Sequence, residues 1–301
     1  MRNQRGQSLV LTLLFLAVLV GLAAAVLDVG SWYRADRKLQ ANADAAALAG
    51  AQDLPGSPAT ARAKALDYAN TNDGGVAAGD VTVRSTTSPG DTIEVKAERA
   101  APGFFAKLFG FNSVTIRAKA VAKTGTLSSA RWAAPVAVDE RHPMLQCGRS
   151  CWNSGNPTTL DFFKVGPGAF RLINIDSSHG GTGPKTLGEW IDNGLDAYMD
   201  KDRWYYSDPG MKPDSANVKN ALDDRDETEL LFPVYRSVRA QGAGFEYYVV
   251  GFAVFHVTGY DIHGSKDSQL YGWFVDMVWE GIQSESGGDP DFGAKAVELI
   301  E

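Results

Sequence analysis

The most prominent hydrophobic feature of the chain is an unbroken apolar run over Leu9–Leu27, which follows the basic start MRNQRGQ. A helix of about 20 residues spans the roughly 30 Å hydrocarbon core of a bilayer. A cleavable export signal has a shorter apolar core of roughly 7 to 15 residues before a small-residue site. We therefore predict a retained transmembrane helix, with a signal released after Ala25 as the alternative.

Behind the apolar run, the pattern changes to a helical period. Good helix formers continue until Pro55 and Gly56, so the membrane helix is expected to extend without interruption to about Asp53. Mostly small apolar residues recur there at spacings of three, four and seven: Val29, Trp32, Leu39, Ala43, Ala46, Ala47 and Gly50. Small side chains let helix backbones approach closely. We expect this stripe to pack against a helix of another protein.

Residues 81–87, 92–98 and 113–123 alternate apolar and polar side chains, as half-buried strands do, and 59–72 has helical character. Between the last two strands, Pro102 is expected to open a short helix that Gly110 closes. Its helically spaced apolar residues, Phe104, Phe105, Leu108 and Phe111, are expected to be core, with a binding patch as the alternative. These elements predict a small α+β module.

The rest of the chain predicts a second mixed module. Runs rich in Val, Phe, Tyr and Trp at 229–238, 245–260 and 270–281 indicate strands. Helices are expected after a capping box formed by Thr186 and Glu189, and after an N-cap at Ser215. The predicted fold class is α+β: a transmembrane helix continuing into a long Ala-rich helix, then two mixed α/β modules. The predicted boundaries are 1–54, 55–126 and 127–301.

Charge excludes one class of partner. The 301-residue chain has a net charge of −7, and no run rich in Lys or Arg follows its N-terminus. Nucleic-acid binding needs a basic surface. We expect no nucleic-acid partner.

Few residues of the sequence are candidates for catalysis or metal binding. His142, His179, His256 and His263 show no metal-ligand spacing, and His256 lies in an apolar strand, where a packed or hydrogen-bonded role is expected. Asp176 and Ser178 fit part of a metal-binding loop, but Gly180 stands where a second hydroxyl is needed. We predict no catalytic, cofactor or metal site. One alternative is an anchored or secreted extracytoplasmic hydrolase, which rests on Asp176, His179 and the acidic stretch 196–210. Another is a secreted binding protein of unknown ligand, released after Ala25.

Cys147 and Cys151 are the only cysteines in the chain. A pair this close, with no further metal ligands at suitable spacing, is expected to form one local structural disulfide in an oxidising exterior. Free thiols are the alternative.

The N-terminal residues resemble the Tad-like family, the TadE and TadG group of Flp pilus (tight adherence) assembly proteins. The resemblance covers about 50 residues and rests on these positions: Arg5-Gly6, Asp28, Trp32-Tyr33-Arg34, Leu39-Gln40, Asp44 and Ala46 to Ala51. It implies a non-enzymatic, pilin-like or accessory component of pilus assembly, which contacts other Tad/Flp or pilin-like proteins through its N-terminal helix.

The resemblance also implies a place in the cell and a processing state. The protein would be single-pass in the cytoplasmic (inner) membrane of a bacterium. The orientation is predicted from the chain itself: the short N-terminal stub is easier to leave inside than the large C-terminal part, so the N-terminus is expected inside and the modules outside. Leu11 stands where processed pilins carry Glu five residues after the cleavage-site Gly, here Gly6. An unprocessed, anchored protein is therefore expected.

Overall fold

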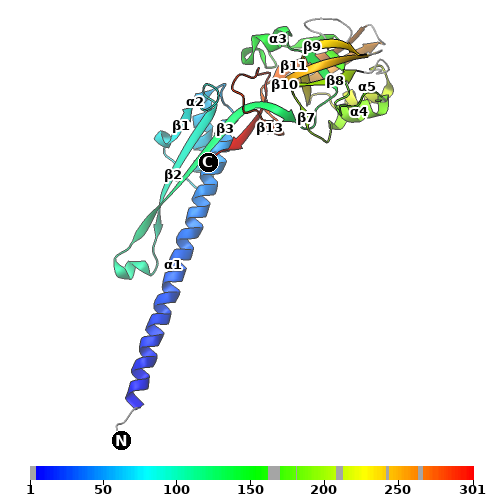
Figure 1. Cartoon of the computed structure of the whole chain (residues 1–301). Helices are drawn as coiled ribbons and strands as arrows, with labels where there is room; N and C mark the ends of the chain where they lie inside the picture. Colours follow the sequence, from blue (N-terminus) through cyan, green and yellow to red (C-terminus); the bar gives the residue numbers. More distant parts are fainter. Residues whose placement is uncertain (1–4, 162–169, 181, 208–212, 242–243, 264–266) are drawn as a thin grey trace. The chain divides into compact units, whose positions relative to one another are not determined.

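The structure is a computed structural model that describes residues 5–161, 170–180, 182–207, 213–241, 244–263 and 267–301. It is a mixed α+β fold with a long N-terminal helix and a sheet-rich C-terminal region, as predicted (Figure 1). The chain divides into two compact units. Unit 1 comprises Met1–Arg84, Thr92–Lys123 and Leu299–Glu301, and unit 2 comprises Ser85–Asp91 and Thr124–Glu298. The three predicted domain boundaries stay predictions.

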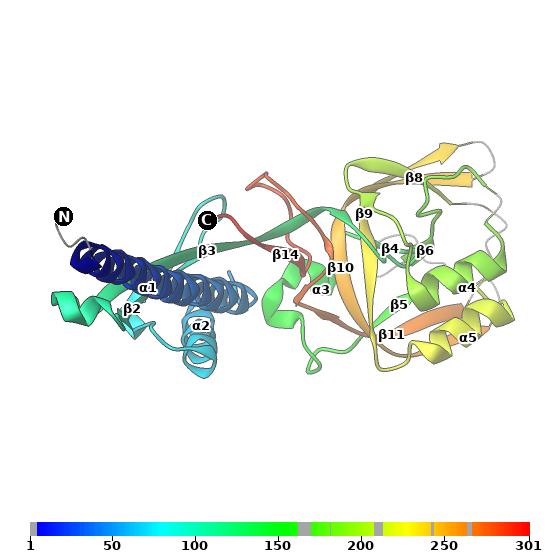
Figure 2. The ribbon, with the colours of Figure 1, turned by 90° about the horizontal axis from the view of Figure 1, so that it is seen from below.

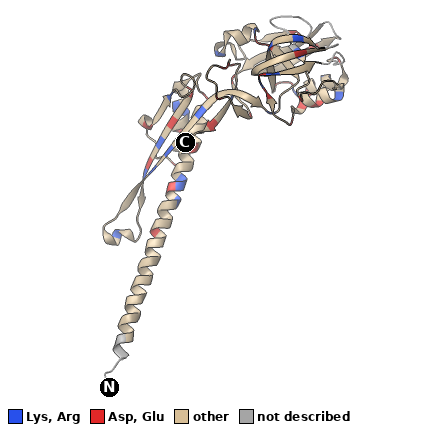
Figure 3. Ribbon diagram, viewed as in Figure 1, with Lys and Arg blue, Asp and Glu red and all other residues tan. Residues whose placement is uncertain are grey.

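Unit 1 is built on α1 (Arg5–Ala51), a single unbroken helix of 47 residues. No charged residue lies between Gln7 and Asp28, as the ribbon coloured by charge shows (Figure 3). Within the described residues, α1 is the one helix long and apolar enough to cross a membrane. The large apolar side chains of its apolar part are exposed, from 46% at Leu19 to 70% at Val26. A helix that is hydrophobic all round and uncovered by protein suits a lipid environment.

The remainder of unit 1 follows the predicted order of elements. Helix α2 (Pro58–Asn72) starts at the N-cap Ser57, and the short helix η1 (Ala78–Asp80) precedes strand β1 (Val81–Arg84). Strands β2 (Thr92–Pro102) and β3 (Ser113–Ala130) form a long antiparallel hairpin, from Thr92↔Lys123 to Pro102↔Ser113, and β1 pairs with β2. The last residues of β3 belong to unit 2.

The small-residue stripe of α1 is the core of unit 1. Ala43, Ala46 and Ala47 are fully buried, as are Ala61, Ala65 and Ala69 on α2. A Cβ added at Gly50 would lie 2.6 Å from Ile93 Cδ1 and 2.7 Å from Ala61 O. The stripe does pack closely against a helix, but that helix is α2 of the same chain, beside the sheet (Figure 1). The expectation of a partner protein is therefore wrong for the part of the stripe from Leu39 to Gly50, because an intramolecular neighbour covers it, whereas Val29 is 59% exposed.

Unit 2 contains a sheet with the strand order β5 (Thr158–Asp161), β11 (Asp267–Val275), β10 (Gly244–His263), β9 (Glu229–Gln241), β4 (Val136–Asp139) and β6 (Phe170–Leu172). Strand β8 (Arg203–Ser207) also pairs with β10. Shorter strands complete the unit: β7 (Met199–Asp200) and β13 (Gly281–Gln283) pair with the end of β3, and β12 (Met277–Val278) pairs with β14 (Ala294–Leu299).

Both faces of the central strands are buried, which explains their nearly continuous hydrophobic sequence. On β10, Phe255 faces a cluster that includes Leu187 of α4 (Pro184–Asn193) and Leu222 of α5 (Ala216–Asp224). Its neighbour Val254 belongs to a second cluster with Tyr205. The two helices lie side by side beside the sheet (Figure 2).

The helix starts in unit 2 test two predictions. The Ser215 hydroxyl accepts a hydrogen bond from the backbone N–H of Val218 at 3.3 Å, so the predicted N-cap of α5 is confirmed. The capping box at Thr186 is wrong, because α4 begins two residues earlier, at Pro184. Proline is well suited to this first helical position, since its missing N–H would have no partner there.

Candidate functional site

Asp28 is the first charged residue after the apolar run, and it is only 3% exposed. The loop at the end of the β2–β3 hairpin, residues 103–112, covers it; we call this loop the tip. The carboxylate accepts hydrogen bonds from the backbone N–H groups of Phe104 (2.8 Å), Phe105 (3.0 Å) and Ala106 (2.6 Å). Charge-assisted bonds of this kind are among the strong ones. Asp28 thus latches the tip to α1.

Contacts of residues next to Asp28 and next to the tip also hold the tip against α1. The indole N–H of Trp32 donates to Pro102 O at 3.1 Å. A Cβ at Gly103 would lie 2.8 Å from Phe111 O and 2.9 Å from Ala106 Cβ, so only glycine fits this close approach. An apolar cleft of about 220 Å³ remains between α1 residues from Gly21 to Trp32 and aromatic residues of the tip.

The tip differs from the sequence prediction in two ways. Pro102 is the last residue of β2, and the short helix η2 (Ala106–Phe109) starts four residues later, at the last of the three N–H groups bound by Asp28, although Gly110 closes it as predicted. The apolar side chains of the tip are not core. Phe104 is 61% exposed and Leu108 82%. Helical spacing predicted a buried apolar face, but among the described residues of unit 1 no element covers these two side chains.

Further along α1, the polar motif residues tie the helix to the rest of unit 1. Gln40 Nε2 donates to Asp44 Oδ1 at 2.7 Å and to Lys119 O at 2.9 Å, and Leu39 is fully buried. Asn42 Nδ2 donates to Ala69 O and Gly74 O, at 3.2 and 2.8 Å. Gly6 lies in the first turn of α1. The motif residues Asp28, Trp32 and Gln40 therefore have hydrogen-bond partners in the β2–β3 hairpin.

An ion-pair cluster lies beside these residues. Asp73 Oδ1 is 2.7 Å from Lys38 Nζ, and its other oxygen pairs with Arg99. Burial raises the pKa of Asp73, but the hydrogen bonds from Lys38 and Arg99 outweigh it and leave the pKa below its usual value. The cluster joins α1, the end of α2 and β2.

The family model described as putative Flp pilus-assembly TadE/G-like matches residues 6–53. This segment is similar to Tad-like proteins, and we call it the Tad-like segment. Comparison with curated proteins gave no match, and comparison with solved structures gave none.

The Tad-like segment ends two residues after α1 and includes both of its halves. Its first half is the exposed apolar run, and its second half supplies the buried stripe of unit 1. The segment therefore combines an apolar run long enough to span a membrane with a core element of unit 1, and polar residues such as Asp28 and Gln40 bind other parts of unit 1.

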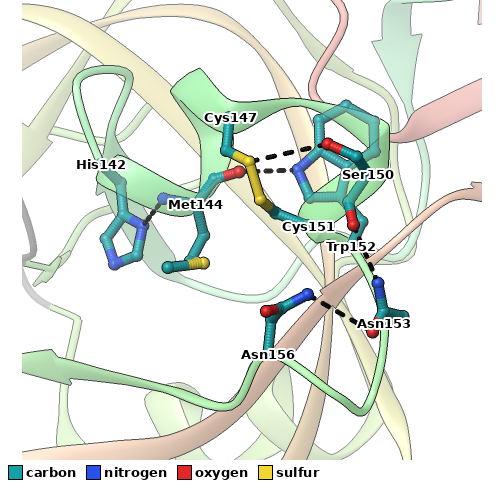
Figure 4. The surroundings of a disulfide bond; sticks show 8 residues. All are labelled: His142, Met144, Cys147, Ser150, Cys151, Trp152, Asn153 and Asn156. Carbon is teal, nitrogen blue, oxygen red and sulfur yellow. Dashed lines mark hydrogen bonds between the residues drawn. A yellow bond between two sulfur atoms is a disulfide. The ribbon is translucent and has the colours of Figure 1, made fainter.

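The cysteine pair lies in unit 2. Cys147 ends α3 (Pro143–Cys147), Cys151 ends η3 (Arg149–Cys151), and the two are joined in a disulfide with their Cα atoms 5.9 Å apart (Figure 4). Trp152 follows directly, buried, and its indole N–H donates to Met144 O at 2.9 Å. His142 caps α3, because its Nδ1 accepts from the backbone N–H of Met144 at 3.2 Å (Figure 4). Burial lowers the pKa of His142 to about 4.

The candidate catalytic residues have structural partners. His256 stacks on Trp273 with ring centroids 4.3 Å apart, and its Nδ1 lies 3.0 Å from Glu229 Oε1, which confirms the packed, hydrogen-bonded role. Asp176 Oδ1 accepts from the backbone N–H of Ser178 at 3.0 Å, and His179 stacks on Tyr206.

No group of three or more His, Cys, Asp or Glu residues within the described part is placed to hold a metal ion. Residues 208–210 of the acidic stretch lie outside the described residues. The predictions of no metal, no cofactor and no catalytic site stay predictions.

Proposed function

We propose that this chain is a non-enzymatic, membrane-anchored component of a Flp/Tad pilus assembly apparatus. One observation carries the proposal: the match over residues 6–53 covers an exposed apolar helix of bilayer length together with the stripe on which unit 1 folds. Such a helix holds a folded unit at a fixed distance from the membrane. Assembly machines need components that are positioned in this way.

Contacts with other Tad or pilin-like proteins would then use the exposed part of α1. The stripe around Ala47 is covered by α2, whereas Ala17 and Ala23 lie on the exposed run and do not line the cleft that faces the tip. Small residues in a membrane helix permit close approach of a second helix. The disulfide supports unit 2 lying outside the cytoplasmic membrane, where thiols are oxidised.

Two measurements test the proposal. N-terminal sequencing of protein extracted from membranes is expected to find residues that precede Ala23, whereas a mature chain that starts at Val26 in the medium would refute the anchor. A strain that lacks the chain should lose surface pili and regain them on complementation. Unchanged piliation would refute the assembly role and leave the anchor standing.

A further inference from the structure

The tip displays a cluster of large apolar side chains. Leu108 is 82% exposed, Phe109 78%, Phe111 65% and Phe104 61%. Single exposed apolar residues are ordinary, but a contiguous cluster marks a surface that contacts protein or membrane.

The tip lies beside the end of the apolar run. The Leu9–Leu27 run is 19 residues, or about 28 Å of helix, which matches a hydrocarbon core. Asp28 binds the tip at the end of this run, and the cleft that Phe109 and Phe111 line reaches back along α1 to Gly21. Gly21 is seven residues before Asp28, or about 10 Å along the helix. When the run occupies the bilayer, the tip reaches the boundary between headgroups and acyl chains.

Most backbone N–H groups of the tip have protein partners, as an apolar medium requires. The N–H groups of 104–106 donate to Asp28, and that of Gly103 donates to Asn112 O at 3.0 Å. Those of Leu108, Gly110 and Phe111 donate to carbonyls within the tip, at 3.0 to 3.1 Å. The hydrogen bonds to the buried Asp28 carboxylate thus provide partners for N–H groups that lipid could not satisfy.

We propose that the tip inserts into the membrane interface beside α1 and is a second lipid-contacting element of the chain. Phe104, Leu108 and Phe109 would lie among the upper acyl chains, and the exposed Lys107 ammonium would reach lipid phosphates, the arrangement of interfacial amphipathic segments. Lipid is the occupant the structure favours, because the tip adjoins the exposed apolar run. The inference rests on the anchor in the proposed function and not on the pilus role.

The test places a spin label at one introduced cysteine of the full chain in phosphatidylglycerol-containing vesicles at low protein content. The labelled sites are Leu108→Cys on the tip, Phe15→Cys in the apolar run and Tyr68→Cys on α2, all exposed in the structure. Unsubstituted protein controls for labelling of Cys147 and Cys151. Collision with oxygen reports lipid, and collision with a water-soluble nickel complex reports water.

We expect the Leu108 label to resemble the Phe15 label, with nickel collisions several-fold fewer than at Tyr68. A Leu108 label as accessible to nickel as Tyr68 would overturn the inference. Shielding from both reagents that decreases on dilution in lipid would overturn it in favour of a second copy. If the Phe15 label also meets water, the anchor itself is wrong, which separates that failure from failure of the tip alone.

Discussion

Asp28 decides the position of a loop 75 residues further along the chain, at Gly103. We expect Asp28→Ala to release the tip, because hydrogen bonds to a charged group contribute about 1.5–3 kcal/mol each, which corresponds to local opening increased about tenfold or more. Trypsin cleavage after the exposed Lys107, in detergent-solubilised protein, measures this opening. Asp36→Ala removes a carboxylate from the same helix and should leave the cleavage rate unchanged. Equal rates in the two variants would contradict the latch.

The protonation of His142, the N-cap residue of α3, should make the stability of the folded chain depend on pH. Its pKa is lowered to about 4 in the folded chain, against about 6.5 unfolded, so between these values only the unfolded state binds the proton. Stability should therefore fall as pH decreases from about 6.5 towards 4, by at most about 3 kcal/mol. Thermal unfolding across this range checks it. His142→Asn keeps a capping side chain without the charge, and should lose less stability on acidification. An identical pH dependence in both proteins would refute the assignment.

At the scale of elements, the stability of unit 1 depends on the close packing of α1 against α2, a contact that we call the seam. Ala47 is fully buried there, whereas Ala41 is exposed on the same helix. Ala47→Leu should destabilise unit 1 by about 1–3 kcal/mol through overpacking, and Ala41→Leu should change little. Thermal unfolding followed by circular dichroism compares the two variants. Equal midpoints would mean that the seam tolerates the added volume, contrary to the close packing described.

At the scale of the whole molecule, the disulfide reports the compartment of unit 2. If the modules lie outside the cytoplasmic membrane, peptide mapping without reduction should recover Cys147 and Cys151 linked. So short a loop should contribute less than the roughly 3 kcal/mol expected for a 15-residue loop, so Cys147→Ser/Cys151→Ser protein should still fold. Recovery of both as free thiols from exported protein would contradict the prediction.

The sequence by itself determined the features that depend on local pattern. The run to Leu27 and the helix formers behind it specify α1 without reference to any contact, and Ser215 and Gly110 mark helix ends through their own backbone preferences. The strands of unit 1 were predictable for the same reason, because alternation over 92–98 and 113–123 is a local signal. The motif from Gly6 to Ala51 predicted the Tad-like segment, since it lies within one helix.

Only the tertiary structure decided what covers each apolar face. Spacing shows that Ala47 and Leu108 each lie on such a face, but not that α2 covers the first and that the second stays exposed. The sequence contains one signal for the contact between Asp28 and the tip, which is a lone Asp at the end of an apolar run. The partners of Asp28 are backbone N–H groups, which every residue except proline carries, so the sequence cannot show which of them it binds. Burial and long-range hydrogen bonds depend on which elements meet in space. Which elements meet depends on how all the apolar faces of the chain are buried together, and this is not a local property of the sequence.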